Sequence, residues 1–290
     1  KELLKKLEQS TLTTKLSEYF DASRGNTVWG YWAITHRKRP DVGGNEFFYL
    51  NEDKVKQYDI PRECLYPLLS SPRYAKYFTF GENDWKNIKC KEAECYLFLC
   101  HKPRNELPEP VLRYVKSGEG PDATIKTRNG NPVSETAASQ ARSNNREFFY
   151  DWYDLGGVIP VKAFASYYAQ YWNRFIYVAN FPAALALDAD LVALIPRKGV
   201  ELDDQEYKAL LAYLNSSIAK LYFEVHGRST GGGALALEAN TLNDTPVIDV
   251  KKLSRSDVEK LAQLFDKLES EARRLGGADS VENVFGSELA

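Results

Sequence analysis

Apolar residues recur at intervals of three and four between Asp204 and Val225, which is the period of one face of an α-helix. The positions are Tyr207, Leu210, Leu211, Leu214, Ile218, Leu221 and Val225. Asp203 or Asp204 can cap the start of this segment through its carboxylate. The pattern predicts one long helix that buries a single apolar stripe against a core.

A second amphipathic segment begins near Ser256, where Ser256 and Glu259 have the spacing of a capping box. Its apolar stripe consists of Val258, Leu261, Phe265, Leu268 and Leu275. Gly276 and Gly277 follow and can end the helix in a left-handed conformation. We therefore expect a packed C-terminal helix.

The rest of the chain contains short runs of aromatic and β-branched residues between turn signals, which indicate strands. The expected strands are 27–35, 46–50, 95–100, 174–179 and 190–195. A helical turn is expected within residues 61–69, and a helix over residues 1–20 with a break near Ser10 and Thr11. Strands and helices do not alternate regularly, so we predict an α+β fold of mixed short strands with packed helices.

Composition is that of an ordinary globular protein, with 43% hydrophobic and 27% charged residues. No apolar run reaches the roughly 18 residues of a membrane span, since Asp188 and Asp190 interrupt the best candidate. The first residues are amphipathic rather than a signal peptide. We expect a soluble cytoplasmic protein, and the absence of methionine and the start at Lys1 suggest a piece of a longer one.

Charge is divided unevenly along the chain, although the net charge is only −2. Residues 24–150 hold 20 basic against 16 acidic side chains, whereas residues 151–250 hold 7 against 12. The sequence pI of about 6.1 is far below the value above ~9 that is typical of a self-sufficient DNA-binding domain. If DNA is the partner, another part of the assembly must supply much of the attraction to phosphate.

Catalytic signatures are missing from the sequence. It contains no phosphate-binding loop, dinucleotide fingerprint, nucleophile elbow or metalloprotease motif. Its three histidines lie far apart, and Cys90, Cys95 and Cys100 lack the C-x2-C spacing of a zinc site. We expect free thiols, no metal site and no catalytic residue in this chain.

One segment carries a specific resemblance. Leu214-Asn215-Ser216-Ser217 is followed by His226-Gly227-Arg228-Ser229-Thr230-Gly231-Gly232-Gly233-Ala234 and later by Thr245-Pro246-Val247. This order resembles the C-terminal specificity region of TaqI-like and Eco57I-like adenine-N6 DNA methyltransferases. Residues 33–35, 45–50, 67–78, 176–179 and 191–196 are similar to other parts of such regions, so the resemblance extends over about 23–250.

The resemblance implies a target recognition domain over residues 23–250, a linker helix over 1–22 from a missing N-terminal methyltransferase domain, and a C-terminal helix and tail over 251–290. The family's Asn-Pro-Pro-Tyr motif and its S-adenosylmethionine loop are absent, since Asn131-Pro132 is followed by Val133. We therefore expect no cofactor in this chain, with S-adenosylmethionine bound by the missing domain of a type II restriction–modification enzyme. The expected partners are double-stranded DNA and that domain.

Candidate DNA-contacting residues are basic or glycine-rich. Arginine can bind guanine through two hydrogen bonds, and glycine allows the backbone to approach DNA closely. A second basic cluster stands before Pro40, and basic residues flank the polar segment 117–145. The candidates are Arg228, Ser229, Thr230, Gly231, Gly232 and Gly233; His36, Arg37, Lys38 and Arg39; and Lys126, Arg128, Arg142 and Arg146.

Two other functions fit the sequence less well. One is a scaffold whose basic loops bind an acidic protein, and the other is a free-standing metal-dependent nuclease. For each candidate residue, a solvated turn or a disordered loop is the alternative interpretation.

Overall fold

The computed structural model describes residues 2–25, 44–156, 161–169, 174–179, 181 and 185–281. Its helices are α1 (Glu2–Gln9), α3 (Asn45–Phe48), α4 (Glu52–Tyr58), α5 (Glu82–Lys89), α6 (Glu109–Ser117), α7 (Ala137–Asn144), α8 (Asp204–Leu214), α9 (Ser217–His226), α10 (Ala239–Asn243) and α11 (Arg255–Leu275). Its strands are β1 (Thr13–Lys15), β2 (Phe20–Arg24), β3 (Tyr49–Leu50), β4 (Leu65–Leu69), β5 (Thr79–Phe80), β6 (Tyr96–Phe98), β7 (Ala163–Ser166), β8 (Tyr168–Ala169), β9 (Phe175–Val178), β10 (Ala186–Leu187), β11 (Leu191–Pro196), β12 (Arg228–Ser229), β13 (Leu235–Ala236) and β14 (Pro246–Ile248). The predicted α+β class is confirmed.

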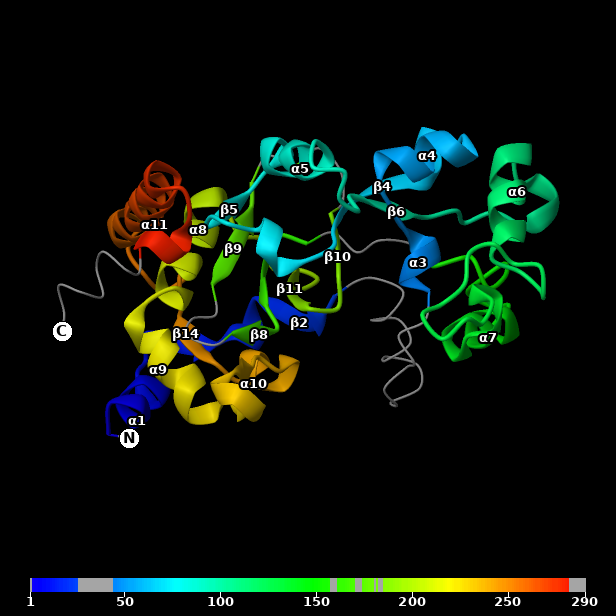
Figure 1. Cartoon of the computed structure of the whole chain (residues 1–290). Helices are drawn as coiled ribbons and strands as arrows, with labels where there is room; N and C mark the ends of the chain where they lie inside the picture. The colour runs from blue at the N-terminus through cyan, green and yellow to red at the C-terminus, as the bar shows by residue number, and fades with distance from the viewer. Residues whose placement is uncertain are drawn as a thin grey trace.

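A five-stranded sheet in the order β2-β11-β7-β9-β5 lies at the centre (Figure 1). Its pairs are antiparallel except for β5 and β9. Alternate residues of β11 enter two different cores, with Leu191 and Ala193 in one and Val192 and Leu194 in the other. Both faces of the sheet are therefore buried around its inner strands, which explains why β7, β9 and β11 are nearly continuous apolar runs.

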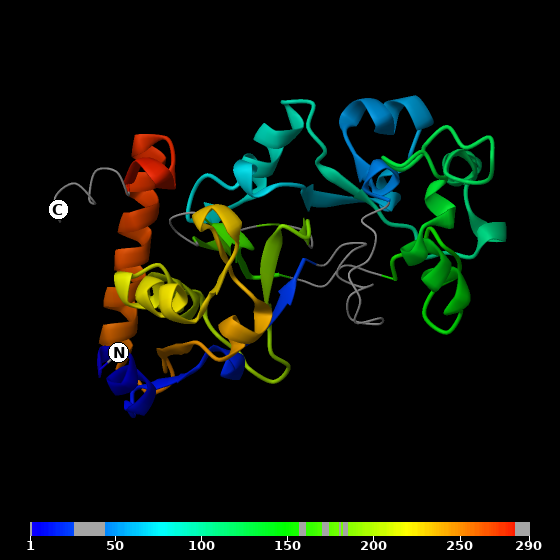
Figure 2. The ribbon, with the colours of Figure 1, turned by 60° about the horizontal axis from the view of Figure 1, so that its bottom comes forward.

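On one side of the sheet, α8 packs along α11 (Figures 1 and 2). The single helix predicted over 204–225 is wrong, because it is divided at Asn215 and Ser216 into α8 and α9. The Ser216 side chain caps the new start by accepting a hydrogen bond from the Ala219 amide. The residues of the apolar stripe that belong to α8 are buried, whereas Ile218, Leu221 and Val225 of α9 are exposed.

On the other side, a four-stranded sheet in the order β10-β4-β6-β3 leads to α3, α4, α6 and α7 (Figure 1). The strand predicted over 46–50 is wrong for its first part, where α3 precedes the short β3. Phe47 and Phe48 are fully buried in this core, so tertiary packing overrides their preference for strands. The turn expected within 61–69 is a 3-10 turn over Arg62–Cys64, and β4 follows it.

The N-terminal segment is less helical than predicted. The helix ends at Gln9, and the threonine-rich β1 pairs with β14 while β2 pairs with β11. Leu4, Leu16 and Phe20 are buried in the same core as α8 and α11. Residues 2–25 thus pack as part of the fold, and the predicted domain boundary after residue 22 lies within β2.

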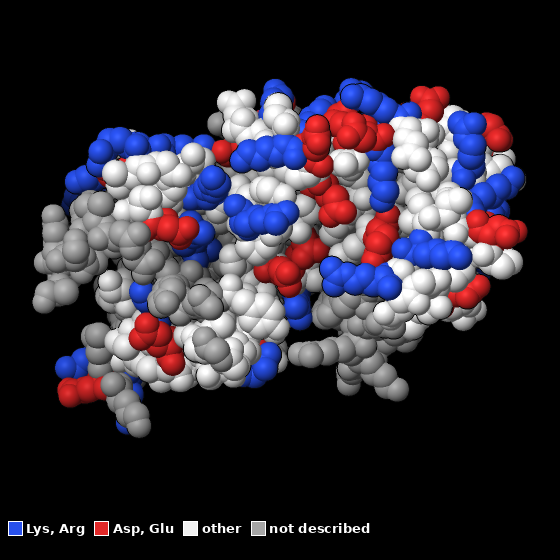
Figure 3. Space-filling model, viewed as in Figure 1, with Lys and Arg blue, Asp and Glu red and all other residues white. Residues whose placement is uncertain are grey.

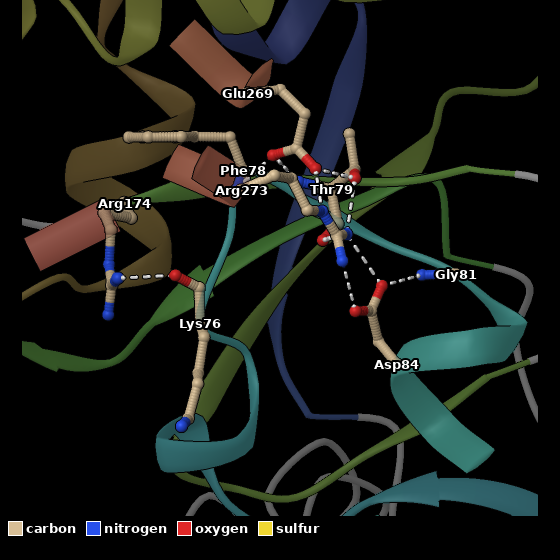
Figure 4. A network of polar contacts seen from close by, with 8 residues as sticks. All are labelled: Lys76, Phe78, Thr79, Gly81, Asp84, Arg174, Glu269 and Arg273. Carbon is tan, nitrogen blue, oxygen red and sulfur yellow. Dashed lines mark hydrogen bonds and ion pairs between the residues drawn. The ribbon is translucent and has the colours of Figure 1, made fainter. Parts of the chain in front are cut away.

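The C-terminal helix agrees with its prediction, but its cap is Ser254 rather than Ser256. Gly276 ends it with a φ of 82°, as expected from its lack of a Cβ. The last turns hold the chain at Phe78 and Thr79 (Figure 4). Glu269 accepts hydrogen bonds from the amides of Phe78 and Thr79, so α11 supports the edge strand β5.

Two further observations concern the described part of the chain. None of its helices is both long and apolar enough to cross a membrane. Cys64, Cys95 and Cys100 are buried free thiols, whereas Cys90 is exposed.

Candidate nucleic-acid interface

The glycine-rich loop lies between two short strands that form a three-stranded sheet with β8. Gly227 marks the end of α9, and a Cβ there would lie 2.5 Å from the carbonyl oxygen of Phe223. Thr230 closes the loop, since its amide and its hydroxyl both donate to the carbonyl of Ala234 at 2.8 Å. By contrast, a Cβ on Gly231 or Gly233 would meet nothing within 4 Å. The loop is therefore held at its base and open at its tip.

Arg228 begins this loop and is exposed. Its Nε donates to Glu238 at 2.5 Å. This hydrogen bond, and to a smaller extent one with Tyr167, raises the pKa of the Arg228 guanidinium. Both partners of this ion pair are more than 40% exposed, so it contributes little to stability and leaves the guanidinium accessible to solvent. Arg228 is thus available to an anionic ligand.

A second arginine, Arg24, reaches the same tyrosine. Its guanidinium carbon lies 3.9 Å from the centre of the Tyr167 ring, and its Nε donates to the carbonyl of Ala189 at 2.6 Å. The neighbouring Tyr168 is 43% exposed. We call Arg24, Tyr167 and Arg228 the arginine–tyrosine cluster; it joins two arginines that are about 200 residues apart in the sequence.

The polar segment 117–145 is an ordered hairpin followed by α7. Lys126 and Pro132 form an isolated bridge, and Arg128 lies on the exposed tip between them. The amide of Arg128 donates to Glu46 Oε1 at 3.1 Å, which ties the tip to α3. Disorder, the alternative interpretation of this segment, is therefore wrong.

A cleft of about 770 Å³ connects the hairpin to the region of Arg24. Its lining includes Arg128, Asp188 and Asp190, and the Asp190 carboxylate lies 3.9 Å from the Arg24 guanidinium. Asp188 is buried and accepts a hydrogen bond from the Tyr49 hydroxyl at 2.6 Å. Burial raises the pKa of Asp188 above its usual range, although the bond from Tyr49 opposes this shift.

Other sequence-predicted residues lie elsewhere. Arg142 is buried on α7, where it donates to the Trp152 carbonyl at 2.6 Å and to Ser139 Oγ at 3.1 Å. Burial lowers the pKa of Arg142, and its role in this structure is to hold α7 against the following loop. Arg146 is exposed beside Asp151, at 3.7 Å. Residues 36–39 lie outside the described residues.

Arg24, Tyr167 and Tyr168 are not among the site residues predicted from the sequence. Arg24 precedes the basic cluster by a dozen residues, and the two tyrosines belong to an aromatic run whose spacing is typical of a core strand. Basic and acidic side chains alternate over the face shown in Figure 3, and no large area of one sign is visible in that view. Charge alone therefore does not identify the interface.

Comparisons with known proteins agree with the resemblance found in the sequence. Residues 41–128 match the family model described as the C-terminal domain of the type II methyltransferase M.Eco57I. The type II methyltransferase M.AccI of Acinetobacter calcoaceticus is 24% identical over 224 residues, which are 77% of this chain and 37% of M.AccI. The crystal structure of the type IIG restriction endonuclease BpuSI superposes with a TM-score of 0.52 at 12% identity, over 92% of this chain and 28% of BpuSI.

These matches define the class: the chain resembles a methyltransferase C-terminal domain of the restriction–modification type, and its fold is found in part of BpuSI. More particularly, it is similar to the M.Eco57I C-terminal domain, and the predicted resemblance to this specificity region is confirmed. The match to that domain includes α3 and the first half of the hairpin but not the glycine-rich loop. The chain spans little more than a third of M.AccI.

Proposed function

We propose that this chain is the specificity domain of a site-specific adenine-N6 DNA methyltransferase and binds double-stranded DNA. The observation that carries the proposal is the arginine–tyrosine cluster beside an open glycine-rich loop. Guanidinium groups bind phosphate and guanine, and a loop without side chains at its tip allows the backbone to enter a groove. The resemblance to methyltransferase C-terminal domains supports DNA as the ligand.

A specificity domain that shares the binding of DNA with a catalytic domain is consistent with the charges of the chain. Methylation of adenine requires the base to leave the duplex, and contacts around the site must offset the cost of unstacking. A specificity domain can provide those contacts without a strongly basic surface if the catalytic domain shares the phosphate contacts. We propose that this second domain binds S-adenosylmethionine, because the 290 residues of this chain lack the family's cofactor loop.

Fluorescence anisotropy of the chain with a random-sequence duplex, measured over a series of salt concentrations, tests the proposal. We expect salt-dependent binding, and Arg228→Ala should weaken it and lower the slope of log K against log salt by about 1. Arg255→Ala is the matched control, since Arg255 is also exposed and paired with carboxylates but lies on α11. Absence of binding at low salt, or equal losses in both variants, would contradict the proposal.

A variant that is expected to bind DNA more tightly provides a second test. Glu238→Gln removes the charge that competes with DNA for Arg228 but leaves the arginine in place. The affinity for DNA should therefore be higher in Glu238→Gln than in the unmodified chain. When both changes are combined, the affinity should equal that of Arg228→Ala. An unchanged affinity in Glu238→Gln would show that Arg228 does not contact the duplex.

A further inference from the structure

The hairpin over residues 126–132 presents three polar side chains at its tip: Arg128, Asn129 and Asn131. All three residues are exposed. The tip is closed by hydrogen bonds from the Thr127 amide to the Asn131 carbonyl at 2.9 Å and from the Gly130 amide to the Thr127 carbonyl at 2.8 Å. Gly130 makes the turn with a φ of 81° and has open space around it. The side chains therefore project from a tight turn.

Both ends of the hairpin are fixed in the core. Ile125 is buried before it, and its amide donates to the Ser117 carbonyl at 2.8 Å. Val133 is fully buried after it, and Arg128 is tied to Glu46 through its amide. A turn held at three points loses little conformational freedom when a ligand binds, which favours specific recognition.

The charge of the neighbouring cleft indicates which part of DNA the tip can meet. Four residues of the hairpin line the cleft: Thr127, Arg128, Asn129 and Asn131. The carboxylates that line it belong to Glu46, Glu94, Glu135, Asp188 and Asp190. Phosphate is repelled by this surface, whereas base edges carry no net charge and present amino groups that donate to carboxylates.

We infer that the tip of this hairpin reads base edges in the major groove, and this inference rests on the proposed DNA-binding function. Arginine binds the O6 and N7 atoms of guanine through two hydrogen bonds, and asparagine binds the N6 and N7 atoms of adenine in the same way. Arg128 therefore specifies a guanine, and Asn129 or Asn131 specifies a neighbouring adenine. Lys126, at the base of the hairpin, contacts phosphate.

Selection of duplexes from a random-sequence library by the chain tests this assignment. The unmodified chain should enrich a consensus, and Arg128→Ala should lose discrimination at one G·C position by roughly 5- to 150-fold. Arg128→Lys should weaken discrimination at the same position, because lysine keeps the charge and can donate to guanine but lacks the planar fork. Asn129→Ala and Asn131→Ala, tested separately, should relax an A·T position next to it in at least one case.

Lys126→Ala is the matched control. It should retain the full consensus but bind all sequences more weakly, with a salt slope lower by about 1. A consensus that is unchanged in the Arg128 and asparagine variants overturns the inference, and so does salt-dependent binding by the unmodified chain without any enrichment. A chain that binds no duplex at all instead overturns the proposed function itself. Circular dichroism melting checks that each variant is folded.

Discussion

The side chain of Asn215 pairs with both backbone polar groups of Phe175. Its Oδ1 accepts from the Phe175 amide at 2.9 Å, and its Nδ2 donates to the Phe175 carbonyl at 2.8 Å. The same Nδ2 lies 2.9 Å from the Leu211 carbonyl. Asn215 thus completes the hydrogen bonding of β9 at the point where α8 ends and α9 begins. The Leu-Asn-Ser motif that indicated the family in the sequence is a structural joint in this fold.

Asn215→Ala should destabilise the protein by about 2 to 4 kcal/mol, because it leaves a buried amide and a buried carbonyl of β9 without partners. Denaturation by urea, followed by circular dichroism, measures the change in the free energy of unfolding. Asn240→Ala on the exposed side of α10 is the control and should change stability by less than about 0.5 kcal/mol. Similar losses in both variants would show that the pairing with Phe175 contributes nothing specific.

Arg273 should be the most important charged residue of α11. Its guanidinium contacts Asp84 at 2.7 and 2.9 Å and Glu269 at 2.6 Å (Figure 4). It also lies 3.9 Å from the centre of the Tyr77 ring. Arg273→Leu keeps much of the stem but leaves the nearly buried Asp84 carboxylate without its cationic partner and with only the Gly81 amide as donor, which should cost about 2 to 4 kcal/mol. The neighbouring Arg274→Leu removes only an exposed pair with Glu271 and should cost less than about 1 kcal/mol. Thermal melting of the two variants measures the loss of stability in each, and equal losses would contradict this prediction.

The sequence alone predicts the elements that local patterns determine. The start of α8 at Asp203, the buried strands β6, β9 and β11, and the left-handed end of α11 at Gly276 all agree with the structure. The division between α8 and α9 escapes prediction, because apolar spacing continues across Asn215 while the break depends on its bonds to a strand 40 residues earlier. Short-range periodicity contains no information about such a partner.

The candidate site is predicted only in part for a similar reason. Arg128 and Arg228 can be predicted as candidate residues from the sequence because each stands in a polar, turn-rich segment. Arg142 has the same local appearance, yet it is buried on α7, where it faces the loop that follows the helix. Arg24 and Tyr167 meet only through the pairing of β2 and β7 with β11, so their cluster exists in the fold and not in any window of the sequence.

The hydrogen bond between Tyr49 and Asp188 should make the effect of Tyr49→Phe depend on pH. Burial raises the pKa of Asp188 in the folded protein, and the Tyr49 hydroxyl lowers it, so removing the hydroxyl raises this pKa further. The folded state then disfavours the charged carboxylate more strongly than the unfolded state, whose aspartate pKa is about 3.9. The loss of stability should therefore be small at pH 4, grow as the pH rises through the pKa of Asp188, and level off above it.

Urea denaturation of Tyr49→Phe at several pH values from 4 to 8 measures this dependence. In an Asp188→Asn background there is no carboxylate to ionise, so the effect of Tyr49→Phe should become independent of pH. A loss that is constant over this range in the parent protein would contradict the proposed linkage.

Gly227 should be the glycine of the loop that tolerates substitution least. A Cβ there would lie 2.5 Å from the Phe223 carbonyl oxygen, which belongs to the backbone of α9 and accepts the Gly227 amide at 2.7 Å. Gly227→Ala must therefore shift the end of α9 or the start of β12, at a cost of about 1 to 3 kcal/mol. Gly231→Ala is the matched control, because its Cβ meets open space and its φ is not in the left-handed region, so its stability should change by less than about 0.5 kcal/mol.

The two variants also show whether the loop contacts DNA itself or only positions Arg228. Gly227→Ala displaces Arg228 through the backbone, whereas Gly231→Ala adds only a methyl group at the tip. If Gly231→Ala binds DNA more weakly while its stability stays unchanged, the tip approaches the duplex closely; if only Gly227→Ala binds more weakly, the loop acts by positioning Arg228.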